Sequence, residues 1–271
     1  MALSIGTNDS AMRASQAASI AARGMEASME RLSTGKRINS ASDDAAGVAI
    51  SSRLSAEVRG TNQSIRNALD GQALIDTAEG AHKEVENILQ RMRELAIQAA
   101  NGTNDTDDIT NLEAEFTALS TEITRIGETT TWAGKALTGT NSTTFSLQVG
   151  SETGTSNQIS VTINSIKSAD IGNGTDDILD LVADGLDNLT ETNNAIVVID
   201  DAIKEVNTQR SELGAVSNRL NHTVNNLTNM SSNLSSAQGR IQDADFALET
   251  TELAKNQILQ QASTAMLAQA N

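Results

Sequence analysis

Few residues in this chain have side chains that commonly carry out chemistry. The 271 residues include no cysteine and two histidines, His82 and His222. Without cysteine the sequence offers no disulfide, no thiol nucleophile and no sulfur-ligated metal. Neither histidine lies in the HExxH pattern of a zinc-dependent peptidase. We therefore interpret both histidines as ordinary residues on helix surfaces.

The densest group of carboxylates lies between Asp170 and Asp187. A calcium-binding EF-hand needs acidic residues at alternate positions, a central glycine and a closing glutamate, and this segment does not have that spacing. No other set of residues combines into a recognisable catalytic constellation. We therefore predict no metal, no cofactor and no enzymatic activity.

Composition restricts both the partners and the fold. With 35 acidic and 19 basic side chains, the net charge of −16 argues against nucleic acid and anionic membranes as partners. No segment approaches the about 20 consecutive apolar residues of a membrane-spanning helix. Proline, which costs about 3 kcal/mol inside a helix, is absent, and this favours long uninterrupted helices. The first eight residues have neither a basic nor an apolar region, so we expect no cleavable secretory signal.

The positions of the apolar residues predict helices over most of residues 1–126 and 192–271. A first, thin helix of small residues is expected from Ser10 to Leu32. A turn at residues 101–105 separates two stretches in which apolar side chains recur every three or four residues, which predicts two antiparallel helices. The first stretch contains Val85, Leu89 or Ile88, Met92, Leu95 and Ala99, and the second contains Ile109, Leu112, Phe116, Leu119, Ile123 and Ile126.

A longer apolar seam runs through the last third of the chain. A strict repeat of seven predicts a helix that supercoils left-handedly against partner helices. If helical throughout, this segment forms a rod of about 75 Å, in which Gly214 and Gly239 are points where it can bend. We interpret the seam up to Leu234 as the core of a bundle within one molecule, and the thinner stripes near the chain ends as packing surfaces between molecules. The seam residues are Ile199, Val206, Leu213, Leu220, Leu227, Leu234, Ile241 and Leu248.

The middle of the chain follows a different pattern. Residues 145–149 and 159–163 each alternate apolar and polar side chains around a turn-rich segment, which predicts a β-hairpin. Residues 165–191 are acidic and predict loops with a short helix at 178–182. We therefore predict a mainly α fold: a long antiparallel helical bundle or coiled coil formed by both chain ends, with a small β-hairpin in the middle.

Three long segments are similar to the bacterial flagellins. One resembles the N-terminal signature of that family, one resembles a motif of the helical domain next to the filament core, and one matches the other end of the family. The resemblance covers residues 1–165, including the strand Phe145–Val149, and residues 192–271. The three segments are RLSTGKRINSASDDAAG at 31–47, QRMRELAIQ at 90–98, and GRIQDADFA at 239–247 followed by ILQQA at 258–262.

The resemblance implies a structural subunit that polymerises with copies of itself into the extracellular bacterial flagellar filament, for swimming motility. It implies a terminal coiled-coil core domain of residues 1–43 plus 240–271. Residues 44–239 then form a helical-bundle domain with the β-hairpin and acidic loops at about 140–190. Because the middle is short, little beyond these two inner domains is expected. The implied partners are the flagellar type III export apparatus, its secretion chaperone, the filament cap and the hook-junction proteins.

The resemblance also implies a recognition surface. Five residues occupy positions of the surface that the host Toll-like receptor 5 recognises in related flagellins, and the same surface is expected to be buried between subunits in the filament. The alternative is that Arg91 and Arg93 are solvated charges paired along helices. The five residues are Gln90, Arg91, Glu94, Leu95 and Glu115.

Two other functions stay open at this point. A hook–filament junction protein has similar ends, and a secreted effector or enzyme on a helical scaffold is the alternative of a different class. The chain departs from the family at Trp132-Ala133-Gly134, where the aromatic residue is usually followed by Asn-Gly. The family also usually continues past the position of Asn271 into a short apolar tail.

The ends and the middle of the chain are expected to behave differently. A thin apolar stripe buries too little area, at about 25 cal/mol per Å², to offset an ordering cost of about 1–2 kcal/mol per residue. We therefore expect residues 1–33 and 245–271 to be disordered in the free monomer and to fold on polymerisation. Residues 101–200 carry 16 acidic and three basic side chains, so we expect screening salt to favour polymerisation.

Overall fold

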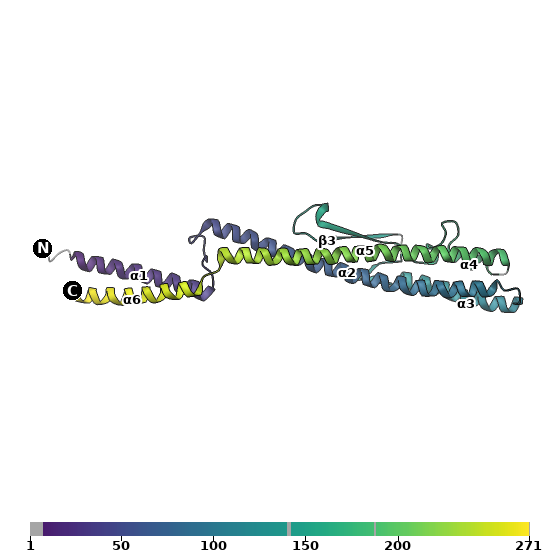
Figure 1. Cartoon of the computed structure of the whole chain (residues 1–271), viewed down its shortest axis with the longest axis horizontal. Helices are drawn as coiled ribbons and strands as arrows, with labels where there is room; N and C mark the ends of the chain where they lie inside the picture. The colour runs from purple at the N-terminus through teal and green to yellow at the C-terminus, as the bar shows by residue number, and fades with distance from the viewer. Residues whose placement is uncertain (1–7, 140–141, 187, 271) are drawn as a thin grey trace. The chain divides into compact units, whose positions relative to one another are not determined.

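The computed structural model describes residues 8–139, 142–186 and 188–270. It confirms the mainly α fold with antiparallel long helices and a hairpin between them (Figure 1). The chain divides into two compact units, which we call the terminal unit, residues 1–59 and 230–271, and the central unit, residues 60–229. The elements are α1 Asp9–Thr34, α2 Ala45–Ala99, α3 Thr106–Thr129, β1 Thr131–Trp132, β2 Lys135–Ala136, β3 Thr143–Gln148, β4 Gln158–Ile163, α4 Ile178–Asp184, α5 Leu189–Gln242 and α6 Phe246–Ala270, with a 3₁₀ turn at Thr155–Asn157.

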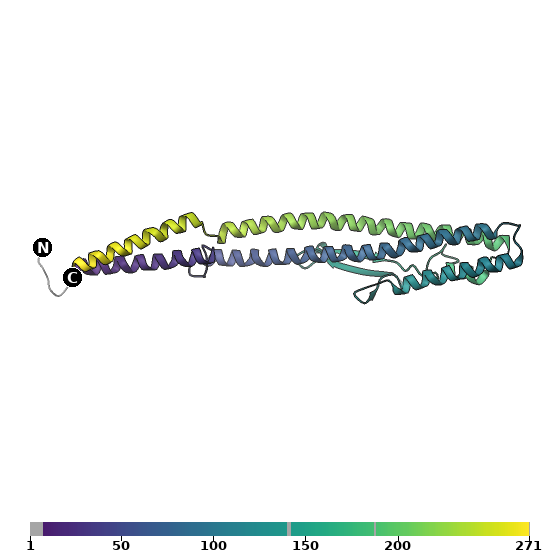
Figure 2. The same cartoon turned by 90° about the horizontal axis from the view of Figure 1, so that it is seen from below.

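In the terminal unit, α1 and α6 lie side by side (Figures 1 and 2). Asn8 caps α1 by accepting the backbone N–H of Ala11 at 3.1 Å. The buried positions of α1 are Ala14, Ala21 and Ser28, which recur every seven residues. The thin helix predicted from Ser10 to Leu32 is therefore present, and the residues at its buried positions are small.

The connector between α1 and α2 is held by the Asp43 side chain and by a backbone bond to residue 244. Gly35, which ends α1 in the left-handed conformation at φ 69°, accepts the N–H of Ala244 at 3.0 Å. Asp43 Oδ2 accepts the backbone N–H groups of Ser40 and Asn39, and these bonds lower the pKa of the Asp43 carboxyl. The sequence from 35 to 44 therefore folds as a specific turn rather than a free linker.

The seam of the last third is interrupted, so the condition under which it forms one continuous rod to Leu248 is not met. The helix α5 passes through Gly214 but ends at Gln242, and α6 begins at Phe246. Asp245 Oδ1 accepts the N–H groups of Ala247 at 2.9 Å and Leu248 at 3.2 Å, and thus caps a new helix. Leu248 is 61% exposed. The seam is buried from Ile199 through Val206, Leu213, Leu220 and Leu227, and half-buried at Leu234 and Ile241.

The core of the central unit contains two apolar clusters. The first joins α2, α3, α4 and α5, and its buried side chains include Leu89, Phe116 and Val206. The antiparallel pair predicted around the turn at 101–105 is present there, and Asp105 caps α3 through a reciprocal pair of bonds with Asp108. The second cluster packs the β3–β4 hairpin on α2 and α5, and it contains Ile75, Ala78, Leu137, Ile159, Val161, Ile163, Leu213 and Leu220.

The β3–β4 hairpin approaches α2 closely. Its strands pair antiparallel with Phe145 opposite Val161, which confirms the predicted hairpin. A Cβ atom on Gly71 of α2 would lie 2.2 Å from a methyl group of Leu147, so any other residue there would require the Leu147 side chain to shift.

A second, two-residue ladder was not predicted. β1 pairs with β2, and the residues between them are Ala133 at φ 48° and Gly134 at φ 81°. Positive φ at both positions is typical of the type I′ turn, which favours Asn-Gly. Here alanine occupies the position for which asparagine is better suited, because an L-residue with Cβ is strained in this region.

We expect Ala133→Asn to raise the free energy of unfolding of the central unit by about 1 kcal/mol, because asparagine tolerates positive φ. Ala133→Val should lower it, since a β-branched side chain is an outlier there. Urea unfolding followed by the fluorescence of Trp132, the one tryptophan, measures both. Equal stability of the two variants would contradict the strain at Ala133.

Candidate functional site

The described residues contain neither a metal centre nor a membrane span. No group of three or more His, Cys, Asp or Glu residues in residues 8–139, 142–186 and 188–270 is arranged to hold a metal ion. Within the same ranges, none of the helices has the length and apolar character to cross a membrane.

The structure corrects the placement of His82. His222 is exposed as expected, whereas the His82 side chain is fully buried and burial lowers its pKa. Its ring Nδ1 lies 2.7 Å from the carbonyl oxygen of Ala78. The spacing of apolar residues could have predicted this burial, because position 82 continues the apolar series of Ile75, Ala78, Val85 and Leu89 on α2.

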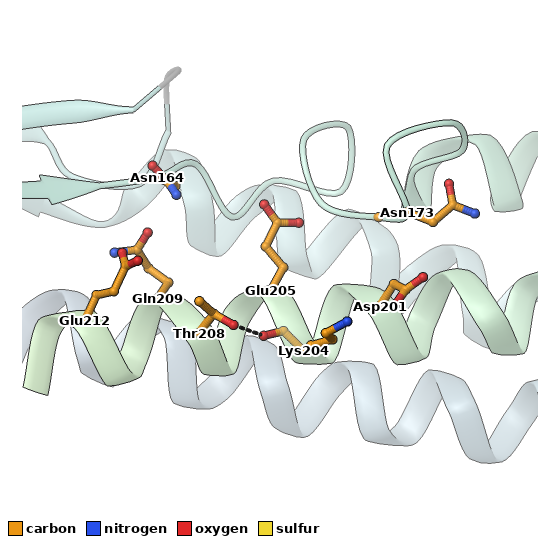
Figure 3. Close-up of a pocket in the computed structure, with 9 residues that line it drawn as sticks. Asn164, Asn173, Asp201, Lys204, Glu205, Thr208, Gln209 and Glu212 are labelled. Atoms are coloured by element: carbon orange, nitrogen blue, oxygen red, sulfur yellow. Dashed lines mark hydrogen bonds between the residues drawn. The ribbon is translucent and has the colours of Figure 1, made fainter.

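An open pocket of about 390 Å³ beside α5 is lined by the carboxylates Asp201, Glu205 and Glu212. Figure 3 shows Glu205 between Glu212 and Asp201, with the three carboxylates spread along the helix rather than converging. Burial raises the pKa of Glu205, a bond from the Gly172 backbone lowers it, and Asp170 raises it. The arrangement is a solvated acidic cleft without the convergent acid, base and nucleophile of a catalytic site.

The predicted recognition surface lies on α2 and α3 of the central unit. The Arg91 guanidinium binds Glu115 of α3 at 2.9 Å and Glu94 of its own helix at 3.0 Å. These bonds, with that to Glu115 the strongest, raise the pKa of Arg91. The Arg91 side chain is still 48% exposed. Arg93 binds Asp200 of α5 through two bonds of 2.6 and 3.3 Å.

Four of the five predicted surface residues are therefore exposed neighbours, and one is not. Gln90 is exposed and lies 3.5 Å from Glu86. Leu95 is 1% exposed and packs in the core with Leu89, so its placement on the surface was wrong. The physical reason is its position on the apolar stripe of α2, which faces α3 and α5.

A second surface was only partly anticipated from the sequence. The buried positions of α1 are small residues, and eight large apolar side chains on α1 and α6 are exposed. The least buried, Phe246, is 68% exposed. An apolar-lined cleft of about 710 Å³ also opens between α1 and α6 beside Ala14, Ala17 and Met266. The exposed apolar side chains are Met12, Ile20, Met29, Phe246, Leu248, Ile258, Leu259 and Met266, and we call them the terminal apolar face.

Contiguous exposed apolar patches mark interaction sites on proteins. Scattered single exposed apolar residues are normal, but these eight are concentrated on two adjacent helices. The sequence showed large apolar residues next to a stripe of alanines on these helices. It could not show whether the large residues lie in the α1–α6 contact or outside it.

Comparison with known proteins gives one consistent family. Residues 5–143 match the bacterial flagellin N-terminal helical region, and residues 196–271 match the bacterial flagellin C-terminal helical region. A flagellin of Halalkalibacterium halodurans is 44% identical over 246 residues, covering 90% of this chain and 86% of that protein. Polar flagellin A of Vibrio parahaemolyticus is 35% identical over 364 aligned residues, covering 100% of this chain and 97% of that protein.

A solved structure supports the same fold. A protein assigned to the flagellar hook-associated proteins of Vibrio parahaemolyticus matches with a TM-score of 0.64, covering 74% of this chain and 100% of that chain. Its sequence is 18% identical, so the likeness concerns the fold alone.

Proposed function

Because the chain belongs to the bacterial flagellin family, we propose that the terminal apolar face is the surface through which its copies pack in the flagellar filament. Flagellins are the subunits of that filament. The chain is accordingly an extracellular structural subunit that polymerises with copies of itself and serves swimming motility. The single observation that carries the packing proposal is the concentration of eight exposed apolar side chains on α1 and α6.

A comparison of burial free energy with ordering cost supports a need for neighbouring copies around α1 and α6. Full burial of a large apolar side chain contributes about 1.5–3 kcal/mol. Within the α1–α6 pair, Ala14, Ala21 and Ser28 bury little area, whereas ordering each residue costs about 1–2 kcal/mol. Contacts with neighbouring copies would bury Met12, Phe246 and Ile258 as well. The folding of both ends on assembly stays a prediction.

Charge supports the same division of roles. The terminal unit has nine basic and ten acidic side chains, whereas the central unit has ten basic and 25 acidic ones. Close packing of many nearly neutral terminal units meets little repulsion. The repulsion between central units falls when salt screens it.

The interruptions between helices support a domain boundary near the predicted one. We propose that residues 1–43 with 240–271 form the filament-core domain and that residues 44–239 form the outer bundle. The two connectors meet through their backbones. Lys36 and Asp243 form an isolated antiparallel β-bridge, and the backbone N–H of Arg37 donates to the carbonyl oxygen of Gln242 at 2.7 Å.

Family membership is also the basis for the remaining partners. We propose that the chain is exported by the flagellar type III apparatus with a secretion chaperone, and that it meets the filament cap and the hook-junction proteins. We propose no catalytic role, in keeping with a family of structural proteins.

Seeded assembly tests the packing proposal. Purified monomer added to short filament fragments should grow into long filaments, and more readily as salt is raised. Ile258→Asn should raise the critical concentration about 10- to 100-fold, because it removes the burial of one large side chain. Electron microscopy and sedimentation measure both effects.

Leu179→Asn is the matched control, since Leu179 is a similarly exposed apolar residue on α4 of the acidic segment. It should leave the critical concentration unchanged. Growth that stops at short assemblies would favour a junction protein, and normal growth of Ile258→Asn would contradict the role of the terminal apolar face.

We propose further that Gln90, Arg91, Glu94 and Glu115 form a surface that Toll-like receptor 5 recognises on the free monomer. The support is that these side chains are exposed neighbours and that the bonds from Arg91 to Glu94 and Glu115 fix their arrangement. A recognition arginine held in this way loses little freedom on binding. In the filament the same face is expected to be covered by other subunits.

A receptor reporter assay tests this surface. Arg91→Ala should lower potency about tenfold or more, as expected for a central arginine of an interface. Its free energy of unfolding should fall by less than about 1 kcal/mol, because exposed ion pairs contribute little. Arg125→Ala is the control, since Arg125 is an exposed arginine on α3 paired with Glu122. Full potency of Arg91→Ala would contradict the proposal.

A further inference from the structure

One polar layer interrupts the seam between α2 and α5 inside the central unit. On one side lie Ala78 and Leu213 of the second apolar cluster, and on the other lie Val85 and Val206 of the first. Between these positions the seam contains a histidine, a glutamine and an arginine. They are His82, Gln209 and Arg210.

Each of the three side chains has one buried polar atom without a hydrogen-bond partner among the described residues. These atoms are His82 Nε2, Gln209 Oε1 and Arg210 Nε. The Gln209 amide nitrogen is satisfied, because it donates to the carbonyl oxygen of Thr162 at 3.1 Å. Unpartnered buried polar atoms are rare, and each costs about 1–3 kcal/mol, so three at one level require an explanation.

The protonation of the ring follows from its one bond. His82 Nδ1 lies 2.7 Å from the Ala78 carbonyl, which can only accept, so Nδ1 carries a hydrogen. In the neutral ring Nε2 is then an acceptor, and in the charged ring it becomes a donor. The layer holds one unused partner for each state: the Nε–H donor of Arg210 and the Oε1 acceptor of Gln209.

The charged side chains around His82 influence whether its neutral or its protonated ring is favoured. The Arg210 guanidinium is bound by Glu79 at 3.7 Å and by Glu86, which lie three residues before and four residues after His82 on α2. Its positive charge therefore lies at the level of the ring and opposes protonation, while Glu79 favours it.

The other elements packed around this level contribute further charged and polar groups. On α3, Glu122 and Arg125 bind each other at 2.6 Å. The hairpin contributes the Thr162 carbonyl through Gln209. On α5, Glu205 and Glu212 line the open pocket beside Gln209.

We propose that His82 is a proton-operated switch in the α2–α5 seam. With a neutral ring, Nε2 is an uncharged acceptor at the level of the Arg210 cation, and the two apolar clusters stay packed on either side of the layer. When the ring gains a proton, Nε2–H donates to the side-chain oxygen Oε1 of Gln209, and the positive charge of the ring repels Arg210. A buried charge must be paired and hydrogen-bonded to be tolerated, so this rearrangement loosens the packing between α2 and α5.

The sign of the effect follows from linkage. Burial, the largest influence, lowers the pKa of folded His82 below the ordinary 6.5, the bond to Ala78 raises it and Arg210 lowers it further. Below pH 6.5 the unfolded chain therefore binds more protons than the folded chain. The stabilisation is fully present above pH 6.5 and is lost as the pH falls through the lower pKa of the folded state.

Ring titration by NMR on the full-length monomer tests the switch directly. The chain has two histidines, so the ring signal that remains in His222→Gln belongs to His82. Its midpoint should lie below 6.5, and the amide protection factors around Ala78 and Glu86, corrected for the slower intrinsic exchange at lower pH, should fall through the same pH range. A midpoint at or above 6.5, or titration without a fall in these protection factors, would overturn the proposal.

Variants separate a switch from a merely structural histidine. Gln209→Glu should raise the midpoint of the His82 ring titration by about one pH unit or more, because a negative charge beside the ring favours the protonated ring. Gln209→Leu should lower it, since the acceptor is removed. No change in either variant would overturn the role of Gln209.

Stability provides a second measurement. Between pH 7.5 and 5, the urea midpoint of the parent chain should fall further than that of His82→Leu. His222→Gln is the matched control and should follow the parent. An equal loss in the parent and in His82→Leu would contradict the switch, and if His82→Leu fails to fold, the ring titration still decides.

Discussion

The burial of apolar side chains repeated along paired helices is the interaction on which the rest of the structure depends. In the central unit, Leu89 and Leu220 occupy such positions and are fully buried within one chain. In α1 the equivalent buried positions are Ala14, Ala21 and Ser28. The same spacing therefore gives a bundle that supports itself and a terminal pair that gains most from contact with other copies. We propose that polymerisation depends on this difference in side-chain size.

Much of the fold could be predicted because it depends on periodicity. The two helices around the turn at 101–105, the β-hairpin and the buried seam from Ile199 to Leu227 follow directly from spacings of three to four, two and seven residues. The terminal segments could be predicted as helices with thin stripes. Their exposed apolar side chains could not be placed, because periodicity identifies a face without showing what covers it.

The errors have local causes. The repeat of seven continues through Leu248, but the carboxylate of Asp245 caps a new helix there and the seam leaves the core. Leu95 belongs to a surface motif in sequence and to the apolar stripe in space. His82 was judged by its polarity, although its position matched the stripe. A local bond explains Leu248, and the apolar face of α2 explains both Leu95 and His82.

The central claim is that α1 and α6 depend on neighbouring copies, whereas the central unit does not. Amide hydrogen exchange on monomer and filament in the same buffer tests it most directly. The account predicts that peptides from Asp9–Thr34 and Phe246–Ala270 exchange rapidly in the monomer and become protected in the filament, while residues 85–126 are protected in both. If the terminal peptides of the free monomer were as well protected as residues 85–126, the account would be contradicted.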